Sequence, residues 1–113
     1  MINVERIDFK RSALLRVAGR IDSSNASDFE EALMEAVEEK HNVVVNLAEV
    51  TFLSSAGIRA LIAALKATRE RAINRGDLLL VEVPPRLKEV FDLAAITSLF
   101  TFYDDEIFAV GAF

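Results

Sequence analysis

The chain has no cysteine, one histidine and only four glycines among its 113 residues, and each shortage argues against certain kinds of functional site. Without cysteine there is no disulfide framework and no thiolate metal site. This suits a reducing compartment, so we expect a cytoplasmic protein. No run approaches the roughly 18 apolar residues of a membrane span, and charge interrupts the amino terminus where a signal peptide is apolar. We therefore expect no contact with a membrane.

The scarcity of histidine and glycine also argues against an enzyme. His41 lies between polar residues in an expected turn, where nothing in the sequence orients it as a base. The glycines, at positions 19, 57, 76 and 111, form no phosphate-binding loop. Five glutamates fall on the outer side of one expected helix, the pattern of a solvated surface rather than of a metal site. We predict no catalytic residue, no metal and no cofactor.

The composition indicates one compact domain. Eighteen acidic and thirteen basic side chains give a net charge of −5, which repels phosphate backbones, so we expect no nucleic-acid partner. A hydrophobic content of 52% is sufficient for one buried core, and the length suits a single domain. We expect that domain to span residues 1–113.

The first 40 residues predict a β-hairpin followed by a helix. Apolar-rich segments at 4–9 and 13–17 are separated by the polar residues 10–12, a spacing typical of a hairpin. Turn-forming residues gather at 19–25, and residues 27–30, Ser-Asp-Phe-Glu, have the spacing of a capping box, so a helix is expected to begin there. Its apolar side chains recur at helical spacing: Phe29, Leu33, Ala36 and Val37.

The remaining chain alternates between buried strands and helices. Residues 42–47 and 78–81 are apolar runs without alternation, typical of strands covered on both faces, and Pro84 and Pro85 end the second. A longer helix is expected between them, ended by residues 74–76, with its apolar stripe at Ile58, Leu61, Ile62, Leu65, Ala72 and Ile73. A short helix around 87–94, a strand at 99–103 and a last helical turn complete the prediction.

This order, β-β-α-β-α-β-α-β-α, defines the fold class. Strand–helix–strand units place their strands in parallel through right-handed crossovers, whereas the opening hairpin is antiparallel. We therefore expect an α/β fold with a mixed sheet of four or five strands, an antiparallel N-terminal hairpin and helices packed on the sheet.

Two adjacent hydroxyls, Ser54 and Ser55, stand where the long helix is expected to begin. Serine is a preferred N-cap, because its oxygen accepts a free backbone N–H, and one serine suffices for that role. A second serine at a helix start is well placed for phosphorylation, since a phosphate would face unpaired N–H groups and the positive end of the helix dipole. Such a modification would alter any surface that the turn presents to a partner.

The segment around these serines resembles the signature of the anti-sigma factor antagonists, the family of the sulfate transporter and anti-sigma antagonist (STAS) domain. Residues 50–59, Val-Thr-Phe-Leu-Ser-Ser-Ala-Gly-Ile-Arg, are similar without a gap to the family's Val-x-Phe-Met/Ile/Leu-Asp-Ser-Ser/Thr-Gly-Leu-Gly. The resemblance places the phosphoacceptor at Ser55. It also shows two departures, because Ser54 replaces the usual aspartate and Ala56 replaces a hydroxyl residue.

A second similarity begins at Gly19. Residues 19–22, Gly-Arg-Ile-Asp, followed by Asn25, resemble the family's turn before its first helix, with Arg20 in place of the usual glutamate. Asp22 corresponds to the family's loop aspartate. A local role for this carboxylate, binding nearby N–H groups of the turn, is an equally good interpretation, and the two roles can coexist.

The resemblance implies a protein that binds proteins. Its unmodified form would bind an anti-sigma factor, usually a serine kinase, and release a sigma factor, while phosphorylation would weaken binding and a serine phosphatase would restore it. We expect a monomer or weak dimer. The expected partner-binding surface around Ser55 comprises Asp22, Ser23, Ser24, Asn25, Ser54, Ala56, Gly57, Ile58 and Arg59.

Other interpretations stay open at this point. Ile58 is also the first residue of the apolar stripe, so a purely structural role for it is at least as good. Loss of the family aspartate favours a non-switching subunit of a larger assembly, like the antagonist-type domains of lipid-transport ATPase complexes or stress-signalling particles. Small-molecule or nucleotide sensing is a third alternative, for which the sequence holds no specific support.

Overall fold

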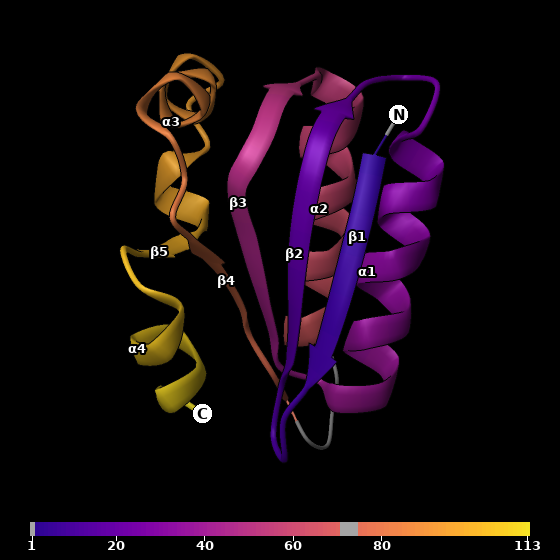
Figure 1. Cartoon of the computed structure of the whole chain (residues 1–113), viewed down its shortest axis with the longest axis vertical. Helices are drawn as coiled ribbons and strands as arrows, with labels where there is room; N and C mark the ends of the chain where they lie inside the picture. Colours follow the sequence, from indigo (N-terminus) through magenta and orange to yellow (C-terminus); the bar gives the residue numbers. More distant parts are fainter. Residues whose placement is uncertain (1, 71–74) are drawn as a thin grey trace.

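The computed structural model describes residues 2–70 and 75–113. Its strands are β1 (Ile2–Asp8), β2 (Ala13–Ile21), β3 (Val43–Leu53), β4 (Leu78–Val81) and β5 (Thr101–Tyr103). Its helices are α1 (Ala26–Lys40), α2 (Ser55–Arg69), α3 (Pro85–Leu93), the short 3-10 helix η1 (Thr97–Leu99) and α4 (Glu106–Gly111). Figure 1 shows the five strands side by side in chain order, so sequential elements are neighbours in space.

The sheet is mixed, as the element order predicts. β1 and β2 pair in antiparallel fashion, and β2, β3, β4 and β5 follow in parallel. The hairpin needs only a short turn, whereas each later connection carries a helix, which is the requirement for parallel neighbours. The predicted α/β fold with an antiparallel N-terminal hairpin is therefore confirmed.

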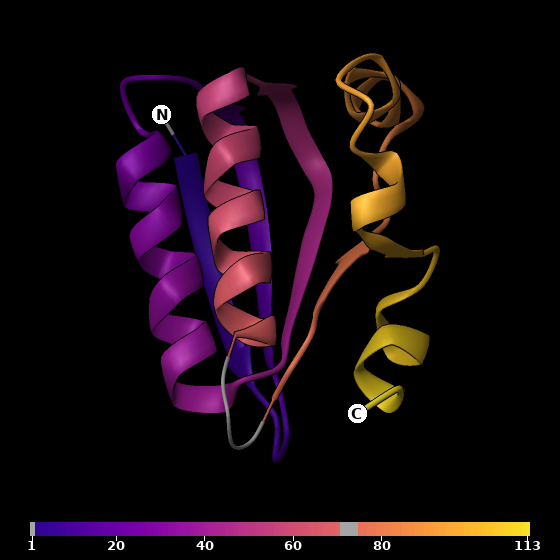
Figure 2. The same ribbon diagram turned by 180° about the vertical axis from the view of Figure 1, so that it is seen from behind.

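Most of the apolar core lies on one face of the sheet, which we call the first face. α1 and α2 lie side by side against it (Figure 2), and their buried side chains meet the alternate residues of β2, β3 and β4. Phe29 of α1 and Leu61 of α2 are fully buried there. The alternation that places Leu15 on this face and Leu14 on the other is the ordinary period of a β-strand.

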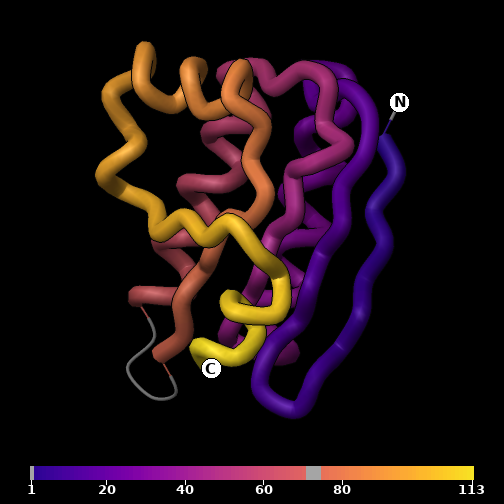
Figure 3. Tube along the Cα trace, turned by 60° about the vertical axis from the view of Figure 1, so that its left-hand side comes forward, coloured from indigo at the N-terminus to yellow at the C-terminus, as the bar shows by residue number. Residues whose placement is uncertain are grey.

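The opposite, second face is covered by the C-terminal segment. β4 pairs with β3 over the first part of that strand, Val43–Asn46, and the chain then passes through α3 and η1 to β5. Figure 3 shows the segment from β5 to α4 crossing the sheet. Ala109 of α4 packs against a small group of buried side chains on this face: Leu14, Val44, Leu79 and Val81.

Four boundaries differ from the predictions: the ends of β2, β3 and α2, and the start of α1. β2 continues to Ile21 and β3 to Leu53, because the two strands pair along their whole length, through bulges that a positive φ of 104° at Gly19 accommodates. The predicted capping box is wrong, since α1 begins at Ala26 with Asn25 at the cap position. α2 ends at Arg69, and the predicted stripe residues Ala72 and Ile73 lie outside the described residues.

Candidate functional site

The candidate site lies at the carboxyl ends of β2 and β3. Ile21 pairs with Leu53 at the last position of both strands, so the two chains leave the sheet next to each other. The backbone N–H of Ser54 donates to the carbonyl of Ile21 over 2.9 Å, so a hydrogen bond links the two segments where they leave the sheet. The loop before α1 and the start of α2, far apart in sequence, therefore form one surface, which we call the carboxyl-end surface (Figure 1).

Ser54 and Ser55 have different environments at the start of α2. Ser54 is the N-cap residue, and its hydroxyl accepts from the backbone N–H of Gly57 over 3.3 Å. Ser55 is the first helical residue and is exposed. Within the part of the chain that the structure describes, its side chain forms no hydrogen bond. The N-cap role is thus filled by Ser54, and the Ser55 hydroxyl is accessible at the positive end of the helix.

Gly57 allows α2 to approach the strand ends closely. A Cβ atom at this position would lie 2.7 Å from Ile21 Cγ2 and 2.7 Å from Leu53 Cδ1, well inside contact distance. The next residue, Ile58, is only 8% exposed and belongs to the first-face core. Both residues therefore set the position of the helix start, and neither forms much of its exposed surface.

The loop before α1 is braced by its own polar side chains. The Asp22 carboxylate accepts from both the backbone N–H and the hydroxyl of Ser24, and the amide of buried Asn25 accepts from Asp22 N and donates to Arg20 O. The hydroxyl and N–H of Ser24 hold the pKa of Asp22 below its ordinary value. Because Asn25 is used inside the loop, it donates or accepts no side-chain cap bond to α1.

The predicted surface residues therefore divide into three groups by their exposure. Ser23, Ser24, Ser55 and Arg59 are exposed, and Asp22, Ser54 and Ala56 are half-buried. Asn25, Gly57 and Ile58 are buried beneath them. All belong to the two segments that the Ser54–Ile21 hydrogen bond joins, so the structure brings the predicted residues together.

Two aromatic and cationic features of this end were missed from the sequence. The Arg20 guanidinium lies over the ring of Phe52, 4.4 Å from its centroid, and Phe52 is 40% exposed. Arg86 of α3 donates to the carbonyl of Val50 over 3.5 Å. Arg20 and Phe52 face each other through the register of β2 and β3, which depends on two bulges, so no local sequence signal could have paired them.

Among residues 2–70 and 75–113, no group of three or more histidine, cysteine, aspartate or glutamate side chains could hold a metal ion. The same described ranges contain no helix that is long and apolar enough to cross a bilayer. The carboxyl-end surface presents the accessible hydroxyl of Ser55, one braced loop and exposed arginine side chains.

The chain belongs to the STAS domain family, whose model matches residues 3–109. Among curated proteins it is 30% identical over 113 residues to the proposed anti-sigma factor antagonist BtrV of Bordetella bronchiseptica, covering 99% of this chain and 93% of BtrV. It is 29% identical over 99 residues to the anti-sigma-B factor antagonist of Staphylococcus epidermidis, covering 87% of this chain and 89% of that protein.

Solved structures show the same fold. The anti-sigma factor antagonist of Mycobacterium paratuberculosis superposes with a TM-score of 0.83 at 24% identity, covering 99% of this chain and 93% of that one. The Bacillus cell fate determinant SpoIIAA in its phosphorylated form superposes with a TM-score of 0.71 at 13% identity, with complete coverage of both chains. These likenesses confirm the fold that the sequence predicts.

Proposed function

We propose that this protein is a cytoplasmic anti-sigma factor antagonist, which in its unmodified form binds an anti-sigma factor and so releases a sigma factor. The relatives that cover nearly the whole chain are antagonists by name, and the exposed hydroxyl of Ser55 carries the proposal. The braced loop at 22–25 and the start of α2 form the binding surface. Ser23, Ser24 and Arg59 contact the partner, while Asn25, Gly57 and Ile58 hold the surface in shape.

The anti-sigma factor in this proposal is a serine kinase that phosphorylates Ser55, and a serine phosphatase reverses the modification. A phosphate adds nearly two negative charges at a position where first-turn N–H groups lack helical partners, so the helix tolerates it. The same charges, buried against a docked protein, would weaken binding. A loss of about 3 kcal/mol lowers affinity by more than a hundredfold.

Ser54 can fill the N-cap role of the aspartate that is usual in the family, but it carries no charge. Either side chain can accept an N–H at an N-cap, and Ser54 does so from Gly57. The missing carboxylate therefore changes the recognition surface and leaves the helix start intact. A kinase that recognises this surface must accept a neutral residue before Ser55.

The test compares Ser55→Asp with Ser55→Ala in binding to the anti-sigma factor purified from the native host. Ser55→Ala keeps affinity near that of the unmodified protein, and Ser55→Asp loses it, while both keep the circular dichroism of the wild type. Ser98→Asp, at another exposed serine in η1, adds the same charge elsewhere and serves as the control. Mass spectrometry after incubation with the kinase and ATP should place phosphate on Ser55. Phosphate on another residue, or on none, rejects the switch.

A second function, a permanent subunit of a larger assembly, is favoured by the absence of the aspartate before Ser55. In that case the protein co-purifies in fixed stoichiometry with a transporter or scaffold, and Ser55→Asp leaves the complex intact. A switching antagonist is instead a monomer or weak dimer that exchanges partners. Size-exclusion chromatography of the native complex before and after phosphatase treatment distinguishes the two.

A further inference from the structure

Helix α4 has an apolar outer side, away from the carboxyl-end surface. Ile107 and Phe108 are 80% and 73% exposed, whereas Ala109 is buried against the sheet. Gly111 follows these two exposed residues at helical spacing, and an added Cβ there would meet no atom within 4 Å. Within the described chain, nothing therefore covers this side of the helix.

An apolar hollow lies between α4 and the β1–β2 hairpin. It is open, has a volume of about 380 Å³ and is lined mainly by apolar side chains: Phe9, Leu14, Ile107 and Val110, with Gly111, Arg16 and Glu106. We call Phe9, Ile107, Phe108 and Gly111, together with this hollow, the α4 patch. Exposed apolar side chains that adjoin one another, rather than being scattered singly, are typical of a surface that binds another molecule.

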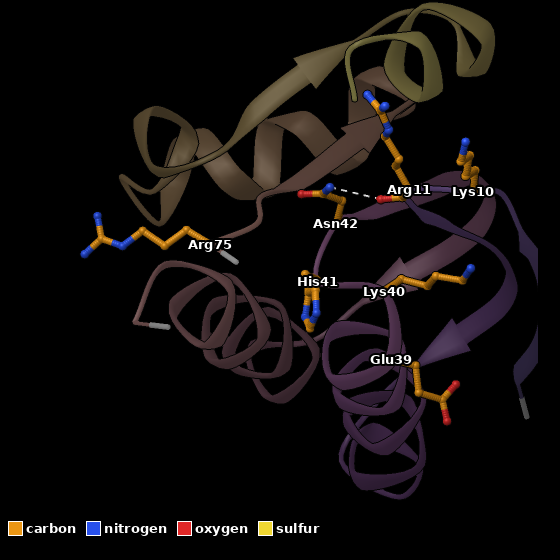
Figure 4. Close-up of a pocket in the computed structure, with 7 residues that line it drawn as sticks. All are labelled: Lys10, Arg11, Glu39, Lys40, His41, Asn42 and Arg75. Atoms are coloured by element: carbon orange, nitrogen blue, oxygen red, sulfur yellow. Dashed lines mark hydrogen bonds between the residues drawn. The ribbon is translucent and has the colours of Figure 1, made fainter. Parts of the chain in front are cut away.

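Charges of opposite sign stand at the two ends of the α4 patch. Asp104 and Asp105 come directly before the first turn of α4, and both are exposed. At the other end, Lys10 and Arg11 of the hairpin turn line a second hollow together with Val110, in the last turn of α4. Figure 4 shows the side chains of Lys10 and Arg11 extending from the hairpin toward the C-terminal ribbon. The patch is therefore acidic at one end and basic at the other.

The four charges at these ends have no ionic partner in the chain. Among residues 2–70 and 75–113, their side chains form no ion pair, and their one hydrogen bond is from the backbone N–H of Ile107 to the Asp105 carboxylate. Arg16 and Glu106, which line the hollow between the two ends, already pair with each other over 2.9 and 3.0 Å. The middle of the patch is thus apolar or internally neutralised, and the two ends are free to meet charges of another molecule.

We propose that the α4 patch joins two copies of this chain in a weak, two-fold symmetric dimer. A two-fold axis places a surface against the same surface of the second copy, so that surface must be complementary to itself. With the axis running across α4, the acidic end of each copy meets the basic end of the other, and Phe108 of each copy lies against the apolar patch of its partner. The charges favour a second copy over another occupant, because one chain supplies both complementary groups.

The dimer leaves the carboxyl-end surface accessible. Leu14 and Val44 pack with α4 near the starts of β2 and β3, whereas Ser55 lies beyond the carboxyl ends of these strands. α4 has only six residues, so the contact falls among small interfaces, which are typical of weak association. A dimer would present two carboxyl-end surfaces, and its formation does not depend on the proposed function.

The first test is sedimentation equilibrium of the full chain over a concentration series that reaches the millimolar range. We expect a reversible monomer–dimer equilibrium. Phe108→Ser should weaken it by about tenfold or more, because an aromatic ring is lost from the centre of the contact. Leu93→Ser replaces a similarly exposed apolar side chain on α3 and should leave dimerisation unchanged. Circular dichroism verifies that both variants are folded.

Charge reversal tests how the two copies are oriented. Asp104→Lys with Asp105→Asn makes the acidic end positive and keeps a side chain that can cap α4. Lys10→Glu with Arg11→Gln makes the basic end negative. Each double variant alone should dimerise less than the wild type, because like charges meet at both contacts, whereas a mixture of the two should form a heterodimer. Each changes the net charge of −5 by three units, so both stay negative and have no general attraction for each other.

Three results would each overturn the proposal. The first is a chain that stays monomeric throughout the series, and the second is a dimer that Phe108→Ser leaves unchanged. The third is a pair of charge variants that fail to associate in the mixture. If the α4 amides shift in NMR spectra only when the anti-sigma factor is added, the patch belongs to that interface and the dimer is rejected. None of the sedimentation results bears on whether the anti-sigma factor binds at Ser55.

Discussion

The two faces of the sheet are stabilised in different ways. On the first face, α1 and α2 pack large side chains such as Phe29 and Leu61 against residues of three strands, among them Leu80, in one continuous core. On the second face, α4 is only six residues long and completes, with its own Ala109, a cluster of five buried residues. Beside that cluster lies an ion pair, in which Glu106 binds Arg16 over 2.9 and 3.0 Å and also accepts from Asn46.

This difference indicates which face contributes most to the stability of the fold and which face is more sensitive to solution conditions. The first face fixes the ends of β2 and β3, and with them the carboxyl-end surface, through packing that involves no charged side chain. The second face depends on a short helix and on charges that solvent can reach, since the Arg16 side chain is 47% exposed. Changes on the second face should therefore cost less and respond to solution conditions.

Phe29→Ala should have the largest effect. The ring is fully buried between α1 and the sheet, so its removal leaves a cavity that surrounding residues fill only in part. We expect a loss of about 3–5 kcal/mol in the free energy of unfolding. Urea denaturation followed by circular dichroism measures it, and a loss below that of Leu79→Ala would contradict the ranking of the two faces.

Leu79→Ala removes a comparable side chain from the second face. Leu79 is 3% exposed and packs in the cluster under α4. We expect about 2–3 kcal/mol, at the lower end of the usual range for Leu→Ala, because a six-residue helix can move into the gap. The same denaturation experiment applies, with unchanged binding to the anti-sigma factor as evidence that the carboxyl-end surface is undisturbed.

Glu106→Gln tests the ion pair and its dependence on pH. The hydrogen bonds from Arg16, and then from Asn46, lower the pKa of Glu106, and Glu106 in turn raises the pKa of Arg16. A carboxylate with a lowered folded-state pKa adds stability above its unfolded pKa, and this stability disappears as the pH falls through the folded value. We expect Glu106→Gln to cost about 1 kcal/mol at neutral pH, because exposure of Arg16 screens the pair.

Unfolding curves of wild type and Glu106→Gln at a series of pH values check this result. The two proteins should differ at neutral pH and converge in acid, below the folded-state pKa of Glu106. Glu30→Gln, at an exposed residue of α1, provides the matched control and should show no such convergence. A difference that stays constant with pH would assign the effect to packing rather than to charge.

The sequence predicts the elements of this fold better than their ends. Apolar periodicity locates α1 and α2, and apolar runs without alternation locate β3 and β4, because burial imposes those patterns locally. The extension of β2 through Gly19 depends on pairing with β3, a contact between distant segments that overrides turn-forming residues. The same holds for the site. The serine pair is visible in the sequence, whereas the stacking of Arg20 on Phe52 follows from register alone.

Ser54→Ala should have the smallest effect on stability, although it lies closest to the proposed site. It removes the hydroxyl that accepts from Gly57 N over 3.3 Å, a long hydrogen bond, so we expect about 0.5–1 kcal/mol, the lower part of the range for N-cap serines. Ser54→Asp supplies an alternative acceptor and places a negative charge at the helix start, so it should restore that stability or exceed it. Thermal unfolding of the wild type, Ser54→Ala and Ser54→Asp ranks the three proteins by stability. If Ser54→Ala were neutral and Ser54→Asp destabilising, Ser54 would not cap α2, and the separation of roles between Ser54 and Ser55 would fail.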